Sequence, residues 1–153
     1  MHGLVEEIYL APEGGARMEK VEQAEALAGF GLRGDRYCER RGYYSYMDSE
    51  VCQVTLIEAE DLEEVARTAG LHVLNGEHRR NLVTRGVRLE QLAGKRFRIG
   101  TAVLEYDRTR PPCSYLQSLT EPGMTCALVE RSGICARVIK SGLIRSKDPI
   151  TIL

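Results

Sequence analysis

Short β-type segments with tight turns recur along this chain, and this pattern constrains its fold more than any other feature. The clearest of these segments cover residues 4–10, 51–57, 95–99, 102–107 and 134–140. Chains with many short strands and tight turns fold as barrels or strongly curved sheets, with small helices filling the ends. We therefore expect a mainly β, barrel-like fold, and the length of 153 residues fits a single domain over residues 1–153.

Only residues 58–67 predict a long helix. Leu62, Val65 and Ala66 recur there at helical spacing, acidic side chains crowd the first turns, and Gly70 follows. The remaining predicted elements are short strands at 18–23, 78–84, 143–144 and 149–153, and helical turns at 89–92, 115–119 and 124–130.

Three glycines within residues 29–34 predict a tight loop that ends in Asp35 and Arg36. Their spacing matches the G-x-G-x-x-G of nucleotide-binding loops, but no buried strand is predicted before it and no amphipathic helix after it. Asp35 either bonds its own backbone as a turn residue or orients an active-site arginine. Residues 37–48, rich in Arg and Tyr, are expected to form an exposed loop.

Positive charge is concentrated between residues 79 and 113, where nine Arg and Lys residues face only three acids. Residues 65–153 together carry a net charge of +8, whereas residues 1–64 carry −9. We expect a cationic cleft that suits an anionic ligand, with a solvated charge run as the alternative. The overall net charge of −1, two Phe and no Trp favour a small phosphorylated ligand over nucleic acid.

The five cysteines are odd in number and include no C-x-x-C pair, which argues against a disulfide framework and a structural zinc site. We therefore expect a reducing, cytoplasmic location. The N-terminal residues carry acids instead of the cations of a signal peptide, and no apolar stretch approaches the roughly 18 residues of a membrane span. Cys52, Cys126 and Cys135 lie in apolar patterns, and we expect them in the buried core.

Cys113 follows Arg110 and two prolines, which present it on a stiff, extended segment within the arginine-rich region. Nearby cations lower the pKa of a thiol, and a soft thiolate suits a soft metal or a persulfide. Cys113 is therefore the candidate functional thiol, against the alternative of an inert buried cysteine. Cys38 is a candidate second redox thiol, and His78 borders the arginine-rich region.

The order and spacing of several motifs resemble the MOSC domain, the C-terminal domain of molybdenum cofactor sulfurases, which is also found in standalone bacterial proteins. The motifs are Gly31-Leu32-x-Gly34-Asp35-Arg36, Arg79-x-Asn81-Leu82-Val83-x-x-Gly86, Phe97-x-Ile99-Gly100, Pro112-Cys113 and Gly133-Ile134-x-Ala136-Arg137-Val138. The resemblance covers nearly the whole chain. It implies a fold like the pyruvate kinase β-barrel and a role in handling the molybdenum cofactor (molybdopterin) or activated sulfur.

The resemblance also implies roles for particular residues. Cys113 would ligate molybdenum directly in a reductase of N-hydroxylated compounds, or carry sulfur as a persulfide in a sulfurase setting. Arg79 and Asn81 match positions that hold the polar groups of the cofactor in relatives, and neighbouring residues extend this patch. The full set of predicted cofactor-binding residues is Arg79, Arg80, Asn81, Arg85, Asp35 and Arg36.

This sequence departs from larger relatives in ways that bear on its partners. We find no N-terminal β-rich domain, no pyridoxal-phosphate desulfurase domain, although pyridoxal phosphate binding is associated with the family, and no ferredoxin-like cysteine cluster. We therefore expect a partner that donates cofactor, sulfur or electrons, or a homodimer that completes the site, and no nucleic-acid or membrane partner. A generic anion-binding barrel in which Cys113 is incidental is the remaining alternative.

Overall fold

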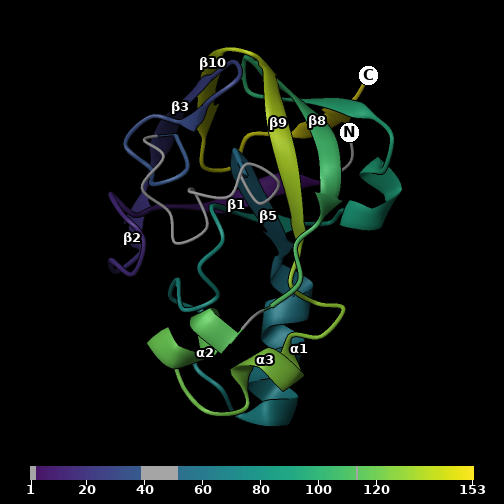
Figure 1. Cartoon of the computed structure of the whole chain (residues 1–153). Helices are drawn as coiled ribbons and strands as arrows, with labels where there is room; N and C mark the ends of the chain where they lie inside the picture. Colours follow the sequence, from purple (N-terminus) through teal and green to yellow (C-terminus); the bar gives the residue numbers. More distant parts are fainter. Residues whose placement is uncertain (1–2, 39–51, 113) are drawn as a thin grey trace.

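The computed structural model describes residues 3–38, 52–112 and 114–153 (Figure 1). In chain order its strands are β1 (Leu4–Leu10), β2 (Glu19–Val21), β3 (Gln23–Leu27), β4 (Gly31–Leu32), β5 (Val54–Glu58), β6 (Leu82–Arg85), β7 (Arg96–Ile99), β8 (Ala102–Thr109), β9 (Ile134–Lys140), β10 (Gly142–Arg145) and β11 (Ile150–Ile152). The helices are α1 (Ala59–Ala69), the 3-10 turn η2 (Leu89–Leu92), α2 (Ser114–Leu119) and α3 (Met124–Ala127). Eight strands form one sheet in the order β11-β7-β8-β9-β5-β6-β1-β2, and three form another in the order β10-β3-β4.

The larger sheet curls so that its two ends approach each other. Leu4 in β1 forms an isolated antiparallel bridge with Pro149, which lies next to β11 at the far end of the strand order. Inside the curl, alternate side chains build the main core: Phe97 and Ile99 of β7 are fully buried, and the arginines that alternate with them, Arg96 and Arg98, are exposed. The predicted mainly β, barrel-like fold is confirmed, although no continuous ladder closes the large sheet among the described residues.

The parallel pair of β5 and β6 requires a long connection, and α1 provides it. Leu62 and Val65 of α1 are buried in a second core that also includes side chains of α3 and of the sheet. β5 is therefore buried along its whole length, which explains why its sequence is apolar or β-branched up to the final Glu58. The predicted helix is confirmed, and it ends as expected at Gly70, whose φ is 68°. Figure 1 shows α1, α2 and α3 gathered at one end of the sheet.

The hairpin predicted at 95–107 is confirmed as β7 and β8, and the strand predicted at 134–140 is confirmed as β9. The strand predicted at 78–84 is wrong in its first half, because Arg79 has a φ of 61° and extended pairing begins only at Leu82. β3 extends beyond the short strand predicted nearby, since its two inward-facing residues are alanines, which signal a strand weakly. No helix in the described part of the chain is long and apolar enough to cross a membrane.

Candidate functional site

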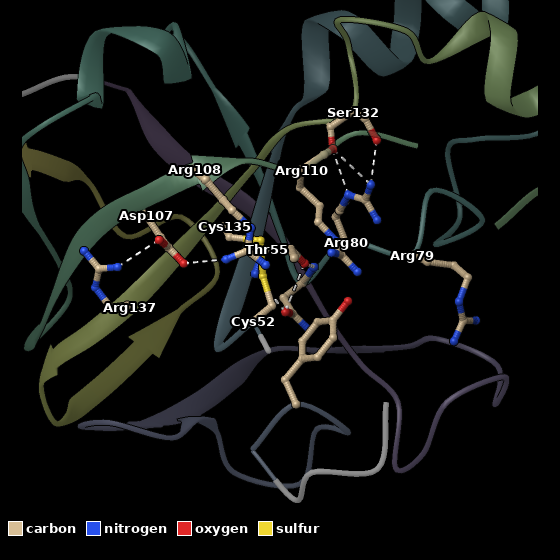
Figure 2. The surroundings of a disulfide bond; sticks show 12 residues. Cys52, Thr55, Arg79, Arg80, Asp107, Arg108, Arg110, Ser132, Cys135 and Arg137 are labelled. Atoms are coloured by element: carbon tan, nitrogen blue, oxygen red, sulfur yellow. Dashed lines mark hydrogen bonds and ion pairs between the residues drawn. A yellow bond between two sulfur atoms is a disulfide. The ribbon is translucent and has the colours of Figure 1, made fainter. Parts of the chain in front are cut away.

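Four arginines from three separate segments gather around the side chain of Tyr37, and we call Arg36, Arg79, Arg80 and Arg110 the arginine cluster. The segments are the loop after β4, the residues that precede β6, and the end of β8. Nη2 of Arg36 donates to the Arg79 carbonyl oxygen over 3.0 Å, and Nη2 of Arg80 donates to the Arg110 carbonyl oxygen over 3.3 Å. Figure 2 shows Arg80 and Arg110 side by side, with Arg79 beyond them.

Tyr37 shows how strongly positive this region is. The expectation of an exposed loop is wrong for this residue, which is only 9% exposed because it packs against Cys52 and Cys135. Burial by itself would raise the pKa of its phenol, and Asp35 acts in the same direction. The positive charges of Arg36, Arg110 and Arg80 outweigh both effects, so that the pKa of Tyr37 is lowered.

Asp35 is fully buried, and its carboxylate contacts both its local backbone and an arginine. One carboxylate oxygen accepts from the Tyr37 amide over 3.2 Å, which is a local turn contact. The other accepts from the Ala11 amide over 3.0 Å and from Nη1 of Arg36 over 3.1 Å. Arg36 is held in turn over the Tyr37 ring, with its guanidinium carbon 4.2 Å from the ring centroid. Asp35 therefore fixes the direction of one arginine in the cluster.

Arg79 is the least compensated member of the cluster. Its Nη1 donates to the Ala16 carbonyl oxygen over 2.7 Å, whereas its buried Nη2 has no hydrogen-bond acceptor among the described residues. Burial, followed by the nearby charge of Arg36, lowers the pKa of Arg79. The residue also lines a cavity of about 900 Å³ whose lining includes two further cations, Arg17 and Lys20, and two acids, Glu19 and Glu77. An anion in this cavity would supply both a charge and an acceptor.

Arg80 ties the cluster to the chain that follows β8. Its Nε donates to the Ser132 carbonyl oxygen over 2.7 Å, and its Nη2 donates to the Ser132 hydroxyl over 2.5 Å. The Arg110 amide donates to the Gly133 carbonyl oxygen over 2.9 Å. Gly133 has a φ of 86°, and a Cβ there would collide with the Leu56 carbonyl oxygen, so the close approach of this turn to β5 requires glycine. These contacts fix the residues that lead towards position 113.

His78 is buried behind the cluster and is neutral at physiological pH. Burial, followed by the charges of Arg80 and Arg79, lowers its pKa to about 3. Its Nδ1 accepts from the Arg80 amide over 2.9 Å, so the proton of the neutral ring lies on Nε2. Nε2 has no partner in the part of the chain that the structure describes, and the ring packs edge-on against Tyr9.

Two residues of the predicted cofactor-binding set have other surroundings. Asn81 is fully buried, and its carboxamide accepts from the amide and hydroxyl of Thr55 and donates to the Tyr9 carbonyl oxygen. Arg85 lies at the other end of β6 and pairs with Glu6 at 2.6 Å and Glu63 at 2.7 Å. Asn81 thus links β5 and β1 through its side chain. Arg85 does not belong to the arginine cluster.

Cys113 lies outside the described residues. The chain is described up to Pro112, and Arg110, Pro111 and Pro112 line a second cavity of about 800 Å³. Arg110 is a cluster residue that our predicted cofactor-binding set omitted, and its position three residues before Cys113 is the signal that could have identified it. Cys38 is partly exposed and has no disulfide bond.

The structure corrects two expectations about the other cysteines. Cys52 and Cys135 are buried as expected, but they form a disulfide bond with a Cα–Cα distance of 6.0 Å (Figure 2). The two residues are 83 positions apart, and only the pairing of β5 with β9 brings them together, which is why their sequence spacing gave no sign of the bond. Cys126, expected in the core, is exposed on the short helix α3.

The family model for the MOSC domain matches residues 43–151 of this chain. Among solved structures, the YuaD protein from Bacillus subtilis is 21% identical with a TM-score of 0.76, covering 99% of this chain and 96% of YuaD. YiiM from Geobacillus stearothermophilus is 16% identical with a TM-score of 0.75, covering 98% of this chain and 74% of YiiM. YiiM from Escherichia coli is 21% identical with a TM-score of 0.67, covering 95% and 69%. No curated protein matches this chain.

Proposed function

This chain belongs to the MOSC domain family, and on that premise we propose that it binds the molybdenum cofactor at the arginine cluster, with Cys113 as the ligand of the metal. The cofactor is anionic because it carries a phosphate group, and its metal is soft enough to favour a thiolate ligand. Both requirements correspond to features of this chain. The arginines provide the positive field, and Cys113 follows the cluster residue Arg110 by three positions.

The observation that carries the proposal is the buried guanidinium of Arg79. Among the residues that the structure describes, its Nη2 has no acceptor and no carboxylate pairs with it. Burying a cation without a counter-charge is unfavourable, and a bidentate phosphate would relieve that cost. Arg17 lines the same cavity and adds positive charge to it, whereas Lys20 already pairs with Glu7 at 2.8 Å, and Glu19 and Glu77 also belong to the lining. The residues present therefore fit the phosphorylated part of the cofactor.

The other members of the cluster would hold the site in shape. Asp35 orients Arg36, and Arg36 bonds the Arg79 carbonyl oxygen, so the loop after β4 and the residues before β6 are fixed relative to each other. Arg80 holds Ser132 and the Arg110 carbonyl oxygen, which fixes the start of the segment that leads to Cys113. Neutral His78 adds no further positive charge behind them.

The reaction that we assign is the reduction of N-hydroxylated compounds. The N–O bond breaks, the nitrogen gains a hydrogen, and the oxygen leaves as water, which consumes two electrons and two protons. When bound, the cofactor supplies two-electron chemistry at its metal. The electrons would come from a redox partner protein, since we found no ferredoxin-like cysteine cluster in the sequence.

Metal content tests the proposal. The wild type, Cys113→Ser and Cys126→Ser would be produced in a host with an intact molybdenum cofactor pathway, and molybdenum would be measured per chain. Cys126 is a matched control because it is exposed and has no disulfide bond. We expect the wild type and the Cys126 variant to retain molybdenum and Cys113→Ser to lose it, because a hydroxyl does not replace a thiolate on a soft metal. Equal metal content in all three proteins would rule out ligation by Cys113.

A second measurement separates reduction from carriage of the cofactor. Metal-loaded protein would be given an artificial low-potential electron donor and an N-hydroxylated amidine, and formation of the amidine would be followed. We expect turnover by the wild type and none by Cys113→Ser. Metal-loaded wild type that forms no amidine would contradict the reductase assignment and favour a carrier, such as one that uses a Cys113 persulfide.

A further inference from the structure

The disulfide between Cys52 and Cys135 lies where the backbone already joins the same two strands. β5 and β9 pair antiparallel through Val54 with Ala136 and Thr55 with Cys135. The covalent bond therefore adds a second link to a junction that hydrogen bonds already make. Both cysteines are buried, and they form a small cluster of buried residues with Tyr37, separate from the two larger cores. The bond is thus not needed to bring these strands together.

A positive charge directly opposite Cys135 favours the reduced form of this pair. Arg108 of β8 is the cross-strand partner of Cys135, and Figure 2 shows its side chain directed towards the disulfide. Nη1 of Arg108 donates to Asp107 over 2.7 Å, but its buried Nη2 has no acceptor among the described residues. A disulfide sulfur is a weak acceptor, whereas a thiolate is a charged one. Reduction would therefore provide the acceptor that Arg108 lacks.

Tyr37 connects the cysteine pair with the arginine cluster. Its ring packs on both cysteines, and its hydroxyl accepts from Nη2 of Arg36 over 3.1 Å. The same Nη2 donates to the Arg79 carbonyl oxygen. A change at the sulfur atoms that shifts the Tyr37 ring would therefore move Arg36 and the backbone of Arg79.

We propose that Cys52 and Cys135 are a reversible thiol–disulfide switch, in which Arg108 stabilises the reduced form and Tyr37 transmits the change to the arginine cluster. In the reducing direction, an external dithiol transfers two electrons and two protons. The S–S bond breaks, Cys52 and Cys135 become thiols, and the external dithiol becomes a disulfide. Cys135 then releases its proton to solvent, and its thiolate accepts a hydrogen bond from Arg108.

A redox titration without any anionic ligand tests the couple and the role of Arg108. The protein would be equilibrated in buffers of oxidised and reduced dithiothreitol, and the fraction of bonded Cys52 would be measured by alkylation and mass spectrometry. We expect a reversible two-electron transition, and Arg108→Gln should favour the disulfide about tenfold, a shift of about 30 mV to lower potential. Arg67→Gln, which removes an exposed charge on α1 that pairs with nearby Glu64, should titrate like the wild type.

Two results of that titration would overturn the proposal. The first is a Cys52–Cys135 bond that does not form in oxidising buffer, or that cannot be reduced without unfolding the protein. The second is an Arg108→Gln variant with the same midpoint as Arg67→Gln, because the charge opposite Cys135 would then have no effect on the couple.

Transmission to the arginine cluster rests on the proposed function and is measured separately. The affinity for inorganic pyrophosphate would be determined by calorimetry for fully oxidised and fully reduced protein, with Tyr37→Phe as the variant that keeps the ring and removes the hydroxyl. We expect the two redox states of the wild type to differ at least threefold in affinity and those of Tyr37→Phe to be nearly equal. Equal affinities in the wild type would overturn the switch. Absence of binding in both states would instead overturn the proposed anion site. The redox titration would still test whether Cys52 and Cys135 form a reversible couple.

Discussion

Arg79 and Arg85 are six residues apart in the sequence, yet their surroundings are opposite. Arg85 is partly exposed and bonds two carboxylates, Glu6 and Glu63, which raise its pKa. Arg79 is buried, bonds a backbone carbonyl, and has its pKa lowered by burial and by Arg36. An arginine whose charge is already compensated has little to gain from an anion. The number of arginines in a segment therefore says less about an anion site than the absence of acids around a few of them.

Other cations of the same segment resemble Arg85. Arg88 pairs with Glu58 at 3.3 Å, and Arg96 pairs with Glu105 at 2.9 Å. The local positive charge counted from the sequence is thus partly neutralised by acids from other strands. Arg79 of the arginine cluster is buried and has no carboxylate partner among the described residues, and this is where we place the phosphate of the cofactor.

The largest effect that we expect on stability comes from the buried ion pair. Asp35→Asn should lower the free energy of unfolding by about 3–5 kcal/mol, because it leaves Arg36 buried without a counter-charge. Chemical denaturation followed by circular dichroism would measure the loss. Glu63→Gln removes one carboxylate from the exposed pair with Arg85 and is the matched control, with an expected change below about 1 kcal/mol. Equal losses of unfolding free energy in the two variants would contradict the distinction between the buried arginine cluster and the exposed ion pair of Arg85.

The next effect depends on pH and concerns His78. The pKa of His78 is about 3 in the folded protein and 6.5 when unperturbed. At a pH between these two values, the unfolded chain therefore binds a proton at His78 and the folded chain does not. Stability should therefore fall as the pH drops below 6.5, and at pH 5 this residue alone should cost about 2 kcal/mol relative to pH 7. His78→Asn keeps an acceptor for the Arg80 amide and does not titrate. If His78 is not buried in its neutral form, the unfolding free energies of the wild type and His78→Asn should depend on pH in the same way.

The smallest effect on stability that we expect concerns Arg85, whose charge is already compensated by Glu6 and Glu63. Arg85→Gln should reduce stability by only about 0.2–1 kcal/mol for each exposed ion pair that it loses, because solvent screens both carboxylates. Thermal unfolding at low and high salt would measure it, and the loss should shrink as salt rises. A loss of several kcal/mol would show that these exposed pairs hold the fold together.

Much of the fold could be predicted from the sequence because it depends on local patterns. The β7–β8 hairpin and α1 follow from alternation, helical periodicity and terminal glycine, and the motif order identified the family. The start of β6 could not be predicted, because Arg79 has a left-handed backbone and contacts Arg36 and Ala16, which are distant in the sequence.

The candidate site was predictable only in part, for the same physical reason. Arg79 and Arg36 could be identified from their motifs, but which arginines meet carboxylates depends on strands that are distant in the sequence. The disulfide between Cys52 and Cys135 and the burial of Tyr37 also arise from such tertiary neighbours. Odd cysteine numbers and a Tyr-rich composition carry no information about them.

The measurement that tests the central claim most directly is cofactor content in Arg79→Gln and Arg85→Gln. Both variants remove one arginine from the same segment, so non-specific loss of positive charge is matched between them. Wild type and variants would be produced in a host that makes the molybdenum cofactor, and the pterin that co-purifies would be measured by the fluorescence of its oxidised form. A bidentate guanidinium–phosphate contact contributes about 1.5–3 kcal/mol, so Arg79→Gln should weaken binding tenfold or more and lose most of its pterin. Arg85→Gln should retain the wild-type content. Equal pterin in the two variants, or a greater loss in Arg85→Gln, would contradict binding at the arginine cluster.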